Sequence, residues 1–111
     1  MAQTSLSCTL FDRPEQVTVA VAGQLDWNTC PTLRKAVKQA LALHRATTVL
    51  DLTDVTFLSS EGVSELVKSN NHAISAGTHL AVVPSTHVRR ILIVTGVDTL
   101  LDVRDTAQPA G

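Results

Sequence analysis

Large apolar residues alternate with polar or small ones in two stretches near the start of the chain. They occupy every second position within 5–11 and again within 16–22. A period of two is typical of a β-strand with one buried face. The Asp-Arg-Pro sequence at 12–14 predicts a turn between the two stretches. The pattern therefore predicts a β-hairpin.

Three later stretches, 29–43, 60–76 and 86–95, have the three- and four-residue spacing of a helix with one buried face. The apolar positions are Leu33, Ala36, Val37, Ala40 and Leu41 in the first, Val63, Leu66, Val67, Ala73 and Ile74 in the second, and Val88, Ile91 and Leu92 in the third. In the second stretch Glu65 falls on the polar side. Gly77 and Gly96 are placed to end the last two helices.

Apolar runs typical of strands separate these helices. A long run occupies 47–58 with a polar break at Thr53-Asp54, and shorter runs occupy 79–83 and 100–103. The predicted order is β-β-α-β-α-β-α-β. It indicates a single α/β domain over 1–111, whose mixed central sheet has a parallel core, an antiparallel edge strand and about three flanking helices. The tail, about 104–111, is expected to be flexible.

Composition narrows the classes of function. The chain of 111 residues has 44% hydrophobic residues and three aromatic ones, so its core must consist mainly of aliphatic side chains. With a formal net charge of -1 the chain has no overall positive field to attract nucleic acid. No apolar run approaches the roughly 20 residues that a membrane span needs. No secretory leader is evident, so we expect a cytoplasmic protein in which Cys8 and Cys30 are reduced.

Nothing in the sequence favours catalysis. The four histidines have no spacing that joins them to a nucleophile, and Ser60 is followed by Glu61-Gly62, so no GxSxG turn is present. No His, Cys, Asp or Glu cluster has the spacing of metal ligands, and the glycines are scattered rather than grouped in a phosphate-binding loop. We expect no enzyme activity, no metal and no cofactor.

Ser59 and Ser60 stand where the long strand leads into the second helix. The first N–H groups of a helix lack internal partners and carry the positive end of its dipole. A serine there either caps the helix or presents a hydroxyl where a phosphate is tolerated. For Ser60 both interpretations stay open.

Three motifs in order resemble those of STAS domains of the anti-sigma-factor antagonist family. Residues 51–63, D-L-T-D-V-T-F-L-S-S-E-G-V, resemble D-L-x-x-V-x-F-[IM]-D-S-[ST]-G-[LI], and residues 23–26, G-Q-L-D, resemble G-E-[LI]-D. Residues 83–101 resemble the closing strand, helix and strand of that family. The resemblance as a whole covers Val17 to Val103.

The resemblance implies a binding module without catalysis. Such proteins bind an anti-sigma factor that is also a serine kinase, which frees a sigma factor, and phosphorylation of a serine at the start of the second helix ends the binding. This is transcription regulation by partner switching in bacterial signalling. The phosphorylated serine corresponds to Ser60, with Ser59 as the alternative. The implied partner-binding residues are Asp26, Trp27, Asn28, Ser59, Ser60, Glu61 and Gly62.

Two departures from the family motif leave alternatives open. Ser59 replaces an aspartate and Glu61 replaces a serine or threonine, which would suit a STAS scaffold or sensor component that is not phosphorylated. A more distant alternative is a small hydrolase that uses Ser60. Trp27 is either a partial core plug or an interface anchor. The basic helix face at Arg34, Lys35 and Lys38 is better interpreted as a solvated surface than as a partner site.

Overall fold

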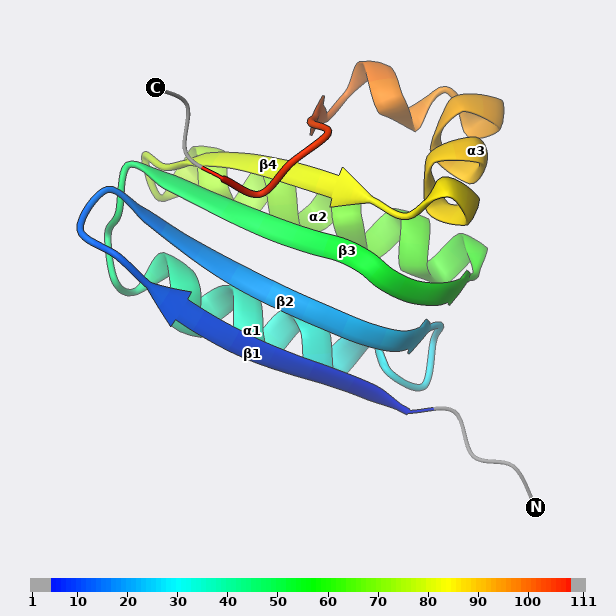
Figure 1. The fold of residues 1–111 in the computed structure, drawn as a ribbon, viewed down its shortest axis with the longest axis horizontal. Helices are drawn as coiled ribbons and strands as arrows, with labels where there is room; N and C mark the ends of the chain where they lie inside the picture. The colour runs from blue at the N-terminus through cyan, green and yellow to red at the C-terminus, as the bar shows by residue number, and fades with distance from the viewer. Residues whose placement is uncertain (1–4, 109–111) are drawn as a thin grey trace.

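The computed structural model describes residues 5–108, which form one five-stranded sheet flanked by helices (Figure 1). The elements are β1 (Leu6–Asp12), β2 (Gln16–Leu25), α1 (Cys30–Leu41), β3 (Thr47–Leu58), α2 (Ser60–Ser75), β4 (His79–Pro84), α3 (Thr86–Thr95), a 3-10 helix η1 (Val97–Thr99) and β5 (Asp102–Val103). The strand order is β1-β2-β3-β4-β5. β1 is antiparallel to β2 and the other pairs are parallel, which confirms the predicted mixed sheet.

The main core lies between the sheet and two helices, α1 and α2, which run behind it in Figure 1. Alternate residues of each strand point into this layer, so the apolar residues that recur at every second position are buried on one face of the sheet. The fully buried members include Val17, Val19, Leu33, Leu50, Leu52, Leu66 and Leu80. No helix within residues 5–108 is long and apolar enough to cross a membrane.

The C-terminal segment covers part of the opposite sheet face. Ala107 packs against Val49, Ala81 and Val83, and the Gln16 side chain donates a hydrogen bond of 2.7 Å to the Ala107 carbonyl. Ala107 of the expected tail, about 104–111, thus contacts the sheet. Residues 105, 106 and 108 are exposed, and the flexibility of the tail stays a prediction. The rest of that expected tail, 109–111, lies outside the described residues.

Two strands continue through positions where the sequence pattern is interrupted. β3 continues through the polar pair Thr53-Asp54, because β2 pairs with it on both sides of the break, at Asp51 and at Asp54. The Asp51 carboxylate accepts bonds of 3.1 and 2.7 Å from the backbone and hydroxyl of Thr53. The register with β2 shifts at this point. β2 continues past Gly23, whose φ of 116° and close contact with the Ser5 carbonyl leave no room for a side chain.

The buried face of α2 differs from the predicted one at two residues. Ile74, expected inside, is 66% exposed, whereas Glu65, expected outside, is only 2% exposed. The buried line passes through Gly62, Leu66 and Ser69 and so turns Glu65 towards α1. The prediction was wrong for these two residues because it followed the apolar side chains alone. Gly77 and Gly96 follow α2 and α3 with φ of 73° and 77°, as predicted.

Candidate functional site

The start of α2 separates the two candidate serines. Ser59 has extended backbone, with φ -86° and ψ 172°, and its hydroxyl oxygen accepts a bond of 3.2 Å from the Gly62 N–H. Its own N–H donates to the Leu25 carbonyl at 3.0 Å. Ser59 is therefore the N-cap of α2 and ties the turn to the end of β2.

Ser60 is the first residue of α2 and is exposed. Its hydroxyl donates a bond of 3.1 Å to a carboxylate oxygen of Glu61, which is also exposed, and takes no part in capping. The interpretation of Ser60 as the N-cap is therefore wrong. The hydroxyl lies on the surface beside helix N–H groups that favour negative charge.

Glycine is required at position 62 because there is no room for a side chain, not because of the backbone angles. A Cβ atom at this position would lie 2.7 Å from the Leu25 carbonyl oxygen and 2.7 Å from a methyl group of Leu58. Only glycine lets the first turn of α2 approach the ends of both strands this closely. Gly62 is buried, so its role in the site is to place Ser60 and Glu61.

The loop between β2 and α1 is closed by its own hydrogen bonds. The Asp26 carboxylate accepts bonds from the N–H groups of Asn28 and Thr29 at 2.9 and 3.1 Å, and the Thr29 hydroxyl accepts from the Asp26 N–H at 3.0 Å. The same hydroxyl donates to the Gln24 carbonyl at 2.8 Å. Asp26 is only 8% exposed, so its carboxylate organises the loop from inside.

Three contacts hold this loop and α1 against the start of α2. Besides the bond between Ser59 and Leu25, the Cys30 thiol donates to the Glu61 carbonyl at 3.6 Å. Arg34 donates two bonds to the Glu65 carboxylate, at 2.7 and 3.3 Å. Burial raises the pKa of the Cys30 thiol, and the Glu65 carboxylate raises it further, so this thiol stays protonated at neutral pH.

The outward side chains of the two turns form a surface that we call the serine face: Trp27, Asn28, Ser60 and Glu61. Trp27 is 72% exposed. Trp27 and Glu61 also line one hollow of about 250 Å³ between α1 and α2. The exposure of Trp27 rules out a core plug and leaves the interface anchor as the prediction.

The basic face of α1 is mixed in character. Arg34 is engaged by Glu65, whose hydrogen bonds raise the pKa of the guanidinium above its ordinary value. Lys35 and Lys38 are exposed and make no ion pair within residues 5–108, as expected for a solvated helix surface.

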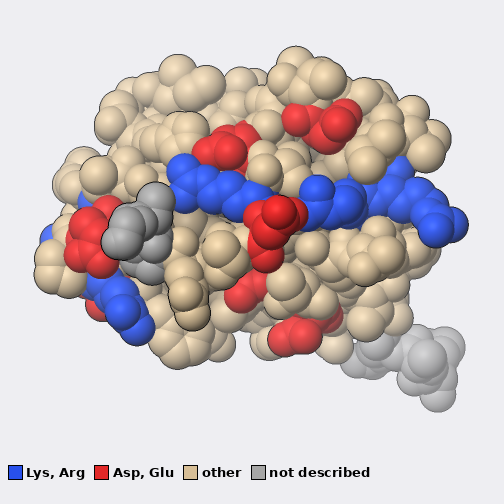
Figure 2. Space-filling view, turned by 45° about the horizontal axis from the view of Figure 1, so that its top comes forward, with Lys and Arg blue, Asp and Glu red and all other residues tan. Residues whose placement is uncertain are grey.

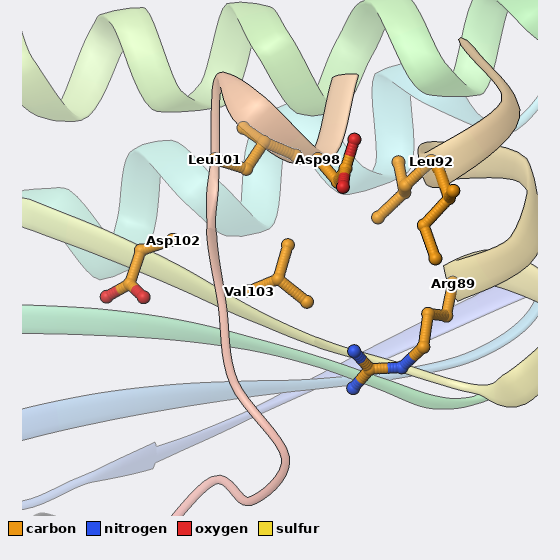
Figure 3. Close-up of a pocket in the computed structure, with 7 residues that line it drawn as sticks. Arg89, Leu92, Asp98, Leu101, Asp102 and Val103 are labelled. Carbon is orange, nitrogen blue, oxygen red and sulfur yellow. The ribbon is translucent and has the colours of Figure 1, made fainter. Parts of the chain in front are cut away.

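A second hollow of about 330 Å³ lies between α3, η1 and β5. Figure 3 shows Leu92, Leu101 and Val103 around it, with the Arg89 side chain reaching from α3 towards the sheet. Arg89 is paired with Asp105 at 2.9 Å, and Asp102 is bound by His79 and Arg104. Of the charged residues that line this hollow, Arg89 and Asp102 are thus paired within the chain, and Asp98 completes the set.

Charges elsewhere on this side of the molecule are mixed. Figure 2 shows basic side chains in a broken row, with acidic side chains between and beside them. Among residues 5–108 no group of three His, Cys, Asp or Glu side chains could hold a metal ion. The Ser60 hydroxyl is bonded to a carboxylate and not to a histidine, unlike the nucleophile of a serine hydrolase. Neither a metal site nor a hydrolase arrangement is thus found among the described residues, and we place the candidate site at the serine face.

Comparison with known families decides the class of this chain. The sequence model described as "Mlab, STAS domain" matches residues 8–102. The chain belongs to the STAS domain family. The resemblance inferred from the three motifs is confirmed at this level, and the comparison with curated proteins finds no match.

Solved STAS structures share the whole arrangement. The anti-sigma factor antagonist from Mycobacterium paratuberculosis is 28% identical, with a TM-score of 0.82, and the match covers 93% of this chain and 88% of that one. The unphosphorylated form of the anti-sigma factor antagonist SpoIIAA is 18% identical, with a TM-score of 0.70 over 88% of each chain. The phosphorylated form of the Bacillus cell fate determinant SpoIIAA is 17% identical, with a TM-score of 0.65 over 88% and 91%. The two SpoIIAA structures show the shared fold alone.

Sequence reasoning brought most of this site together but missed one of its parts. The structure places Trp27, Asn28, Ser60 and Glu61 on the surface and Asp26, Ser59 and Gly62 beneath it. The ion pair between the partly exposed Arg34 and the buried Glu65 was not anticipated. The small residues Gly62 and Ser69 on the same side of α2 were the available signal that another helix approaches there.

Proposed function

We propose that this STAS protein is an anti-sigma-factor antagonist that binds an anti-sigma factor with serine kinase activity through the serine face. Binding would release a sigma factor in the bacterial cytoplasm, and phosphorylation of Ser60 would end the binding. The proposal is supported by family membership and by the 28% identity to an anti-sigma factor antagonist over nearly the whole chain. The observation that carries it is the exposed Ser60 hydroxyl beside a separately capped helix start.

The geometry suits a switch of this kind. Because Ser59 caps α2, a phosphate on Ser60 would leave the cap in place, and the helix dipole would stabilise its charge. A partner surface docked on the serine face would instead meet about -1.5 to -2 additional charge beside the exposed Glu61 carboxylate. An interface penalty of about 2.7 kcal/mol lowers affinity about a hundredfold.

The residues of the serine face have separate tasks in this proposal. Trp27 supplies exposed aromatic area of the kind that anchors protein interfaces. Ser60 and Glu61 supply the polar centre. Asp26, Ser59 and Gly62 act indirectly, since their contacts set the positions of these exposed side chains.

One observation favours a second candidate, a STAS scaffold or sensor component that is not phosphorylated. The Ser60 hydroxyl is bonded to Glu61, where the family motif has a serine or threonine. A fixed carboxylate at this position stabilises the first helical turn by about 0.3–1 kcal/mol and needs no kinase. In this alternative the serine face binds its partner whether or not ATP is present.

A binding titration distinguishes the two candidates. Each anti-sigma factor of the source cell is titrated into the unmodified protein and into the protein phosphorylated at Ser60. The switch predicts that one of them binds the unmodified form about a hundredfold more tightly and releases its sigma factor on binding. Equal affinity of both forms favours the scaffold. Absence of binding by every anti-sigma factor contradicts the proposal.

A further inference from the structure

The two edges of the sheet are protected to very different degrees. β5 has two residues, and the following segment turns back over the sheet. β1 has seven residues, Leu6–Asp12, in continuous register with β2 and with no bulge. Lysine, arginine and proline, which commonly protect an edge strand, are absent from it. Within residues 5–108, β1 pairs on one side only.

The hydrogen-bond pattern shows which groups of β1 point outward. Arg13 and Gln16 exchange both backbone bonds, at 2.9 and 3.3 Å. Bonded residues alternate along an antiparallel pair, so the odd-numbered residues of β1 face β2. The outward N–H and C=O groups are those of Leu6, Cys8, Leu10 and Asp12. They form a regular ladder that another strand can complete.

The side chains along this edge are incompletely covered. Leu6, Cys8 and Leu10 pack against the core but stay half-buried, whereas Val17 and Val19 of the neighbouring strand are 0% exposed. On the other face Phe11 is 56% exposed. A strand added to β1 would cover both groups of side chains.

The charges of β1 do not oppose its pairing with β1 of a second copy of the chain. The only charged residue of β1 is Asp12, and Arg45 neutralises it with two bonds of 2.8 and 2.9 Å. We propose that two copies of this chain pair antiparallel through β1, with a two-fold axis at Thr9, to form a continuous ten-stranded sheet. This register pairs all seven residues, places the outward ladders opposite each other, and sets Cys8 against Leu10 of the other copy.

The proposed dimer leaves the serine face accessible. Ser60 follows the end of β3, which is separated from the β1 edge by β2. Each dimer therefore presents two such faces, and a bivalent partner would gain avidity from them. The pairing does not depend on the proposed function.

Sedimentation and cross-linking test the pairing directly. The protein is expected to show a concentration-dependent equilibrium between monomer and dimer. Thr9→Lys places two positive charges opposite each other at the axis and is expected to raise the dimer dissociation constant at least about tenfold. Thr32→Lys adds the same charge to the exposed surface of α1 and should leave the constant unchanged.

Cysteine substitution tests the register. At the axis the two Thr9 Cα atoms form a non-hydrogen-bonded pair about 4.5 Å apart, within disulfide range. In a Cys8→Ser background, Thr9→Cys should form a covalent dimer on mild oxidation. Ser7→Cys should not, since the two positions lie about 13 Å apart along the strands. A monomer at all concentrations up to the solubility limit overturns the proposal. So does a dimer insensitive to Thr9→Lys, or one that Ser7→Cys cross-links as readily as Thr9→Cys.

Discussion

The two turns that lead into α1 and α2 use their polar residues in opposite ways. In the first, the Asp26 carboxylate is buried and all its observed bonds lie within the loop. In the second, Ser59 caps α2, and the next residue, Ser60, is left on the surface. The comparison teaches that a motif of polar residues at a helix start divides into residues that build the turn and residues that the turn presents.

The largest effect is expected from filling the space at Gly62. Gly62→Ala should lower the free energy of unfolding by about 3 kcal/mol, because the new methyl group meets the Leu25 carbonyl at 2.7 Å. Denaturant unfolding measures this loss. Gly77→Ala is the control, with φ 73° but open space around it, and should lose about 1 kcal/mol. Equal losses would mean that α2 does not approach the strands this closely.

Removal of the buried carboxylate comes next. Asp26→Ala leaves the N–H groups of Asn28 and Thr29 without this acceptor and should lower the free energy of unfolding by about 2 kcal/mol. Asp26→Asn keeps an acceptor oxygen and should lose about half as much. Asp54→Ala, at an exposed position, should change stability by less than about 0.5 kcal/mol. If Asp26→Ala behaves like Asp54→Ala, the carboxylate does not organise the loop.

Trp27 should affect binding and leave folding nearly unchanged. Because it is 72% exposed, Trp27→Ala should alter the free energy of unfolding by less than about 0.5 kcal/mol. Loss of an interface anchor costs about 2 kcal/mol in affinity for the anti-sigma factor, or roughly thirtyfold. Calorimetric titration measures the second effect and thermal unfolding the first. Unchanged affinity would remove Trp27 from the interface.

The smallest effects on stability are expected from alanine substitution of the two adjacent serines, Ser59 and Ser60. Ser59→Ala removes the cap of α2 and should lower the free energy of unfolding by about 1 kcal/mol. Ser60→Ala removes only a surface hydroxyl and should change it by less than about 0.5 kcal/mol. Matched denaturant unfolding of both variants provides the measurement. The reverse order would show that Ser60, and not Ser59, caps the helix.

The sequence predicted the fold well because periodicity and glycine positions are local properties. The hairpin, the parallel core and the ends of α2 and α3 all followed from spacing. The continuity of β3 through Thr53 did not, because it depends on pairing with β2 on both sides of that residue. The packing of Ala107 depends on contacts with distant strands, which no local pattern records.

The candidate site was predictable in its residues but not in their roles. The motif located Ser59 and Ser60 within one helical turn. Which of the two caps the helix depends on the exact residue at which α2 begins, and the sequence does not determine this. Burial of Glu65 arises from the approach of α1 to α2, and the Asp26 carboxylate is enclosed by the loop that it organises. Buried polar residues of this kind can be recognised only from the tertiary structure.

The most direct measurement is the intact mass of the protein after incubation with ATP and its anti-sigma kinase, for the wild type, Ser59→Ala and Ser60→Ala. If Ser60 is the presented residue and Ser59 the cap, the wild type and Ser59→Ala each gain one phosphate, and Ser60→Ala gains none. A phosphate retained by Ser60→Ala and lost from Ser59→Ala would contradict this assignment. A kinase that binds all three proteins and modifies none would leave the serine face as a binding surface without a phosphorylation switch.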